Sequence, residues 1–132
     1  MLAACVEHFK NNEKVRAMAR FNYVELPVAD IGRSKGFYAA AFGWAFTDFG
    51  PTYAATLSGD TDIGLQGDRE QATAVLLPVI DVADLEAALE QVRAAGGVIA
   101  QPIFAFPGGR RFHFRDPDGH EIGVVQADPA HD

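Results

Sequence analysis

The chain has few of the features that mark several common classes of protein. It has one cysteine in 132 residues, too few for an internal disulfide or a thiolate metal cluster. No apolar run approaches the roughly 18 residues that a membrane helix needs. The first ten residues lack the basic start and the apolar length of a signal peptide. We therefore expect a cytoplasmic protein that does not contact a membrane.

Basic residues are scarce as well. Lys and Arg together number 11 against 18 Asp and Glu, which gives a formal net charge of −7. Such a chain repels a phosphate backbone unless a local basic stripe reverses the sign of the field. The only basic cluster is the pair Arg110 and Arg111. We therefore expect no nucleic acid partner.

What is present suits one folded domain. Hydrophobic residues make up 48% of the chain and charged residues 22%, an ordinary balance for a globular protein. We place the domain at residues 21–127, between an N-terminal extension (1–20) and a polar tail (128–132). Met18 lies just before the first strand, so one hypothesis is that the extension reflects an upstream translation start. The other is a helix packed on the sheet or on a partner.

The order of predicted elements repeats along the chain. A strand at 21–28 is followed by an N-cap at Asp30, a helix at 31–42 that Gly43 ends, and three short strands at 44–49, 52–57 and 62–66. A strand at 73–82, an N-cap at Asp84, a helix at 85–95 and strands at 98–104, 110–115 and 121–126 repeat this order. The sequence predicts an α+β fold of two βαβββ modules, at about 21–70 and 73–127.

Three segments carry a family resemblance. They are LPVADIGRSKGFYAAAFGW, DLEAALEQVRAAGG and FRDPDGHEIGVVQ, and together they resemble the vicinal oxygen chelate superfamily. That superfamily includes glyoxalase I, extradiol dioxygenases, fosfomycin resistance proteins and bleomycin-binding proteins. The resemblance implies curved mixed sheets around a cavity and, in many members, a homodimer. Because a fold does not fix a function, the site must be assessed position by position.

The resemblance also implies where a divalent ion would be held. Metal-binding members place His, Gln or Glu on the first strand of each module and on the last strand. The matching positions here are Tyr23, then Leu77 or, in a rival register, Ala74, and finally Gly123. Divalent ions need nitrogen or oxygen donors from such positions. We therefore predict no metal site and no cofactor.

Polar residues near these positions are the candidate site. Side chains two apart on a strand share a face, which groups Tyr23 with Glu25 and Glu121 with Gly123. His113 matches a position that carries a substrate-contacting aromatic residue in the fosfomycin resistance relatives. The resulting ligand-pocket prediction comprises Tyr23, Glu25, Leu77, Phe104, His113, Glu121 and Gly123.

Two hypotheses remain for the polar members of this set. In one, Glu25, His113 and Glu121 form a displaced metal site or an acid–base group, because histidine carries protons near neutral pH. In the other, they make hydrogen bonds within or beside the sheet and have no chemical role. Arg110 and Arg111 follow a Pro-Gly-Gly stretch that we expect to form a mobile loop, and they are candidates for contacting an anionic ligand. The alternative is a solvated hairpin tip.

These observations favour a glyoxalase/bleomycin resistance-like protein that binds a small organic molecule without the family's metal. A metal-dependent lyase, isomerase or dioxygenase is the first alternative. A dimeric regulatory or assembly module is the second. The sequence leaves open whether any reaction is catalysed.

Overall fold

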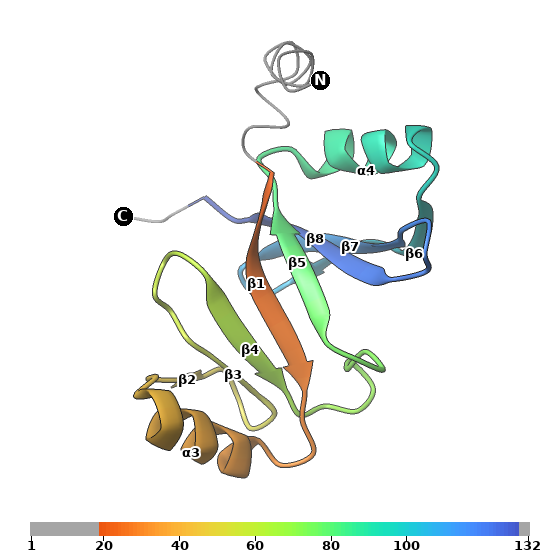
Figure 1. Cartoon of the computed structure of the whole chain (residues 1–132). Helices are drawn as coiled ribbons and strands as arrows, with labels where there is room; N and C mark the ends of the chain where they lie inside the picture. The colour runs from red at the N-terminus through yellow and green to blue at the C-terminus, as the bar shows by residue number, and fades with distance from the viewer. Residues whose placement is uncertain (1–18, 130–132) are drawn as a thin grey trace, which may run out of the picture. The chain divides into compact units, whose positions relative to one another are not determined.

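The computed structural model describes residues 19–129 and has an α+β fold (Figure 1). Its described elements follow the order βαβββ twice, which confirms the predicted fold class and repeat. The predictions for the N-terminal extension and the polar tail fall mostly outside the described residues. The first module contains β1 (Arg20–Pro27), α3 (Ile31–Phe42), β2 (Thr47–Asp48), β3 (Tyr53–Ala55) and β4 (Asp62–Gln66). The second contains β5 (Leu77–Asp81), α4 (Leu85–Ala94), β6 (Val98–Phe106), β7 (Gly109–Arg115) and β8 (Glu121–Ala127).

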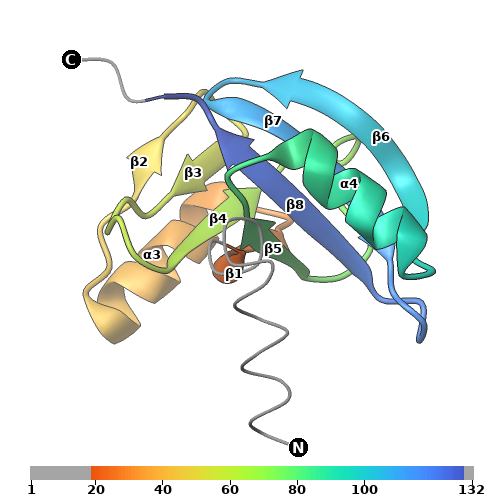
Figure 2. The same cartoon turned by 90° about the horizontal axis from the view of Figure 1, so that it is seen from above.

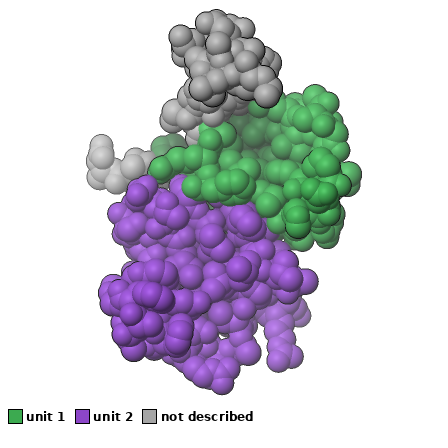
Figure 3. All heavy atoms as spheres, viewed as in Figure 1, with its two compact units in different colours: residues 1–21, 80–132 green, residues 22–79 purple. Residues whose placement is uncertain are grey.

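The chain divides into two compact units (Figure 3). Unit 2 is Asn22–Val79, and unit 1 comprises Ile80 onward together with the segment that ends at Phe21. The first two residues of β1 and the last two of β5 therefore count with unit 1. No helix in residues 19–129 is both long enough and apolar enough to cross a membrane.

Unit 2 is built on strands in the order β2-β3-β4-β1. β1 and β4 run parallel, with Glu25 opposite Gly64, while β3 runs antiparallel to β4. α3 contacts β3 and β4 in this unit. A parallel pair requires a crossover connection, which α3 together with β2 and β3 supplies. This arrangement puts the middle of β1 next to the middle of β4.

The ends of α3 are set by the residues that the sequence analysis identified. The Asp30 carboxylate accepts a hydrogen bond from the Arg33 backbone N–H at 3.0 Å. Gly43 has a φ of 72° and donates its N–H to the Ala39 carbonyl at 2.9 Å. No residue of α3 is buried. Tyr38 and Phe42 of the helix stack with each other and with Trp44, and Phe37 meets Tyr38 edge-on.

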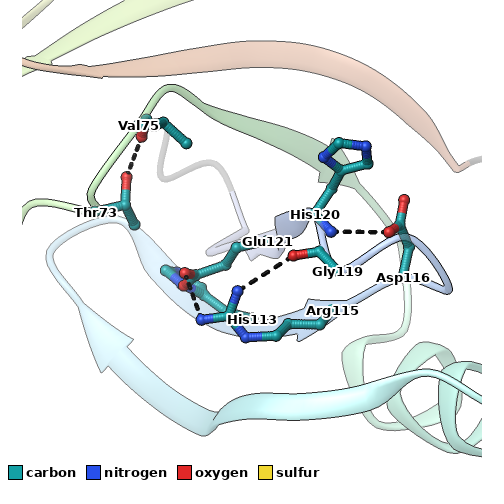
Figure 4. Close-up of polar contacts among 8 residues, drawn as sticks. All are labelled: Thr73, Val75, His113, Arg115, Asp116, Gly119, His120 and Glu121. Carbon is teal, nitrogen blue, oxygen red and sulfur yellow. Dashed lines mark hydrogen bonds and ion pairs between the residues drawn. The ribbon is translucent and has the colours of Figure 1, made fainter.

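Three strands are shorter than predicted, and the one predicted at 52–57 covers only Tyr53–Ala55. The segment 44–49 has strand structure only at Thr47–Asp48, because Trp44 stacks on Tyr38 with a centroid distance of 5.4 Å. The strand predicted at 73–82 begins only at Leu77. Before it, the Thr73 hydroxyl donates to the Val75 carbonyl at 2.6 Å (Figure 4). Such a local side-chain bond competes with the strand ladder and delays its start.

Unit 1 packs α4 against one face of an antiparallel sheet of β8, β7 and β6 (Figure 2). Asp84 caps α4 as predicted, since its carboxylate accepts the Ala87 N–H at 3.0 Å. The apolar face of the helix covers the sheet and removes both from water. The buried core of this unit is Val82, Leu85, Ala88, Leu89, Phe112 and Val124.

The β6–β7 connection differs from the loop that the sequence predicted. β6 extends to Phe106 and pairs it with Gly109, so only Pro107 and Gly108 lie between the strands. Gly108 has a φ of 106°, a conformation that most residues avoid. The segment is therefore a hairpin turn. At the β7–β8 connection, Gly119 has a φ of 85° and donates its N–H to the Asp116 carbonyl at 2.9 Å, which closes a second tight turn.

Candidate functional site

Four residues at the centre of unit 2 form what we call the tyrosine cluster: Tyr23, Glu25, Tyr53 and Gly64. Tyr23 and Glu25 lie on the same face of β1, as strand alternation predicted. The Tyr53 hydroxyl, from β3, lies 3.0 Å from Glu25 Oε1 and 2.5 Å from the Tyr23 hydroxyl. Glu25 is only 2% exposed. A buried carboxylate therefore lies at one end of a chain of two phenols.

The chemistry of the groups fixes the direction of these hydrogen bonds. An ionised carboxylate can only accept, so the Tyr53 O–H donates to Glu25. Tyr53 has a single proton, so its contact with Tyr23 uses the Tyr23 O–H as donor. Burial, followed by the charge of Glu25, raises the pKa of Tyr53 far above its usual value. Tyr53 therefore remains a protonated phenol.

Gly64 is the residue that gives the two phenols room. A Cβ at this position would lie 2.0 Å from the Tyr23 hydroxyl and 2.2 Å from the Tyr53 hydroxyl. The sequence analysis missed both Gly64 and Tyr53 as site residues. A glycine inside a strand is a known signal of close approach by another group, and it was the one available clue.

A second polar group lies in unit 1, where His113 on β7 is opposite Gly123 on β8. His113 Nδ1 lies 2.7 Å from Glu121 Oε2 (Figure 4), and Arg115 Nη2 lies 3.6 Å from the other oxygen of that carboxylate. His113 is 1% exposed. When Glu121 is ionised, Nδ1 must carry the proton in this bond, which fixes the tautomer of a neutral imidazole. The pair has the form of an oriented acid–base group.

The two arginines of the hairpin have different surroundings. Arg110 forms a two-pronged ion pair with Glu86 of α4, at 2.5 and 3.0 Å. Arg111 lies over the rings of Phe104 and Phe106, at 5.1 and 5.5 Å from their centroids. The charge of Arg110 is thus matched by Glu86. Contact of either arginine with an anionic ligand stays a prediction.

The structure assembles the predicted site in two parts, each within its own unit. Tyr23 and Glu25 are joined through Tyr53 in unit 2, where Leu77 is fully buried. Phe104, His113, Glu121 and Gly123 are neighbours in unit 1. That the two parts line one pocket stays a prediction.

The residues at the three family metal positions do not fit a divalent ion. The Tyr23 hydroxyl is engaged with a second phenol, Leu77 offers only a buried aliphatic chain, and Gly123 has no side chain. Within residues 19–129, no three His, Cys, Asp or Glu side chains gather into a possible ligand set.

Fold and sequence together define the family. The family model "Glyoxalase/Bleomycin resistance protein/Dioxygenase superfamily" matches residues 20–124, and the chain belongs to this superfamily. Over 117 residues it is 31% identical to "Putative glyoxylase CFP32" of Mycobacterium bovis, a match that covers 80% of this chain and 45% of that protein. Over 113 residues it is 30% identical to "Anthracycline biosynthesis protein DauV" of Streptomyces sp. strain C5, covering 79% of this chain and 40% of that protein.

The chain spans less than half the length of these curated relatives. Among solved structures, methylmalonyl-CoA epimerase from Mycobacterium tuberculosis is similar, with a TM-score of 0.68 at 16% identity. That match covers 88% of this chain and 91% of the epimerase. At this identity the likeness shows the fold alone.

Proposed function

We propose that this protein binds a small organic molecule without the divalent ion of its metal-dependent relatives. The observation that carries the proposal is the tyrosine cluster. At the first-strand metal position, the oxygen of Tyr23 is tied to Tyr53, which is tied in turn to the buried Glu25. A hydroxyl chain of this kind recognises polar groups of a ligand by hydrogen bonding.

The names of two relatives support a small-molecule ligand. One is named for a glyoxylase and the other for anthracycline biosynthesis. These names point to different chemistry, and neither fixes the ligand of this chain. What they share is an organic molecule of modest size. The aromatic rings of Phe104 and Phe106, with Arg111 over them, offer a matching surface for such a ligand.

Two measurements test the proposal. Elemental analysis after purification without chelator should find less than about 0.1 divalent ion per chain. Adding Mg²⁺, Mn²⁺, Ni²⁺ or Zn²⁺ should leave the melting temperature unchanged, because an ion held only by the folded state must raise it. A small-molecule library should in contrast contain ligands that raise it. A stoichiometric bound ion that the Glu121→Ala variant loses would favour the metal-dependent alternative. A library in which no compound raises the melting temperature would favour an assembly module.

A further inference from the structure

We propose that two copies of this chain associate through an aromatic face on unit 2. The aromatic face comprises side chains of α3 and of the segment that follows it: Phe37, Tyr38, Phe42, Trp44 and Phe49. The partner is a second copy of the same chain, related to the first by a two-fold axis. The proposal goes beyond ligand binding and does not depend on it.

The first step is that the second half of α3 is apolar on all sides and buried on none. Residues 37–42 read FYAAAF, in which the hydroxyl of Tyr38 is the only polar side-chain group. A helix that is hydrophobic all round is ordinarily buried. Here no residue of α3 is buried, and Phe37 and Phe42 are 61% and 62% exposed. The fold of one chain therefore covers this helix less than its composition requires.

The second step is that the rings of α3 and Trp44 lie against one another. The centroid of the Phe42 ring is 5.2 Å from that of Trp44 and 6.4 Å from that of Tyr38. Phe37 meets Tyr38 edge-on, with a centroid distance of 5.1 Å. A large contiguous apolar patch on a folded domain marks an interaction site, and the centres of protein interfaces are rich in aromatic residues.

The third step concerns area. The four most exposed rings of the aromatic face are 61%, 62%, 40% and 53% exposed, in Phe37, Phe42, Trp44 and Phe49. Since an aromatic side chain buries about 150–250 Å² when it is fully covered, these rings together still expose roughly 400 Å². A standard interface buries about 800 Å² on each partner, so the rings supply about half of it. The exposed alanines at 39–41 lie among them and add to the apolar area.

The charge of the aromatic face favours a second copy as the partner. The whole chain carries a formal net charge of −7, so two copies repel each other except where their surfaces are nearly neutral or basic. Residues 31–47 contain Arg33 and Lys35 and no Asp or Glu. Asp48, the next residue, lies 2.7 Å from the Lys35 ammonium. A nearly neutral face can meet its own image across a two-fold axis, whereas an anionic lipid surface requires a cluster of basic residues.

Sedimentation equilibrium at a series of protein concentrations tests the proposal. The wild type should show a reversible monomer–dimer equilibrium between about 1 and 200 µM. Phe37→Glu and Phe42→Glu each place a charge in the aromatic face and should raise the dissociation constant of the dimer about tenfold or more. The matched control is Phe21→Glu, because Phe21 is 58% exposed and lies outside the aromatic face. This control should dimerise as the wild type does.

Trp44 gives an independent readout, because it is the single tryptophan of the chain. When the wild type is diluted below its dissociation constant, the Trp44 emission should move to longer wavelength and become more accessible to acrylamide. In Phe42→Glu the emission should have the monomer value at every concentration. Phe21→Glu should again behave as the wild type does.

Several results would overturn the proposal. They are a wild type that is monomeric at about 200 µM, a dimer that both variants of the aromatic face leave intact, and a dimer that forms without any change in Trp44 emission. Monomeric wild type that binds vesicles containing phosphatidylserine, with loss of binding in Phe42→Glu, would assign the face to a membrane instead. Loss of folding in both variants, seen by circular dichroism, would also overturn the proposal, because the rings would then be needed within one chain.

Discussion

The tyrosine cluster makes a quantitative prediction about stability that needs no knowledge of the ligand. Tyr53→Phe removes one hydroxyl and with it two hydrogen bonds, to Glu25 at 3.0 Å and from Tyr23 at 2.5 Å. A bond to a charged group contributes about 1.5–3 kcal/mol and a neutral one about 0.5–1.5 kcal/mol. We expect Tyr53→Phe to lower the free energy of unfolding by about 2–4 kcal/mol.

A double-mutant cycle isolates the contact between the two phenols. Tyr23→Phe and Tyr53→Phe each remove the Tyr23–Tyr53 hydrogen bond, so the double variant loses it only once. The cost of the double substitution should therefore be smaller than the sum of the single costs by about 1 kcal/mol.

Urea unfolding followed by circular dichroism measures all four proteins of the cycle. The dependence of the free energy on urea should be the same for each, because the surface exposed on unfolding hardly changes. If the sum of the two single costs equals the cost of the double variant to within about 0.3 kcal/mol, the proposed Tyr23–Tyr53 hydrogen bond is refuted. If Tyr53→Phe lowers the free energy of unfolding by less than about 0.5 kcal/mol, the claim that Tyr53 donates a hydrogen bond to a buried Glu25 is refuted.

Three further predictions concern other parts of the chain. Gly64→Ala should cost about 1–3 kcal/mol by overpacking, and less when both tyrosines are already phenylalanine, which urea unfolding of the combined variant would show. Burial alone would raise the pKa of Asp62, but hydrogen bonds from Ser58, Thr56 and Gly59 outweigh it and lower the pKa below 3.8. Ionised Asp62 thus stabilises the fold above about pH 4, and its contribution is lost as the pH falls through the folded pKa, so the melting-temperature gap between wild type and Asp62→Asn should narrow toward pH 2. The resemblance predicts a homodimer, which a concentration-independent monomer mass in sedimentation would contradict.

The local signals in the sequence were enough to predict most elements of the fold. Asp30 and Gly43 set the ends of α3 within the chain itself, since a cap needs only its own turn of helix. The start of β5 and the tight β6–β7 turn were predicted less well. Strand ends depend on partners far along the chain, such as the pairing of Phe106 with Gly109, and on local bonds such as that of Thr73.

In the candidate site too, patterns within one strand were predictable from the sequence, whereas contacts between segments far apart along the chain were not. Strand alternation correctly placed Tyr23 and Glu25 on one face of β1. It could not bring in Tyr53, which reaches Glu25 from a three-residue strand positioned by its pairing with β4. Likewise, Arg110 and Arg111 look equivalent in the sequence. Only the fold shows that one meets Glu86 and the other lies over aromatic rings.

The alternation of side chains along β7 and β8 explains how the fold can be kept while the site chemistry diverges. Phe112 and Val124 are almost fully buried in the core that α4 covers. Their neighbours His113 and Gly123 point to the opposite face of the same strands. A substitution at Gly123 therefore leaves the packing of Val124 beneath α4 in place, and the same holds for His113 and Phe112. Core residues and candidate-site residues therefore alternate along these strands, so a glycine at position 123 is compatible with an intact sheet.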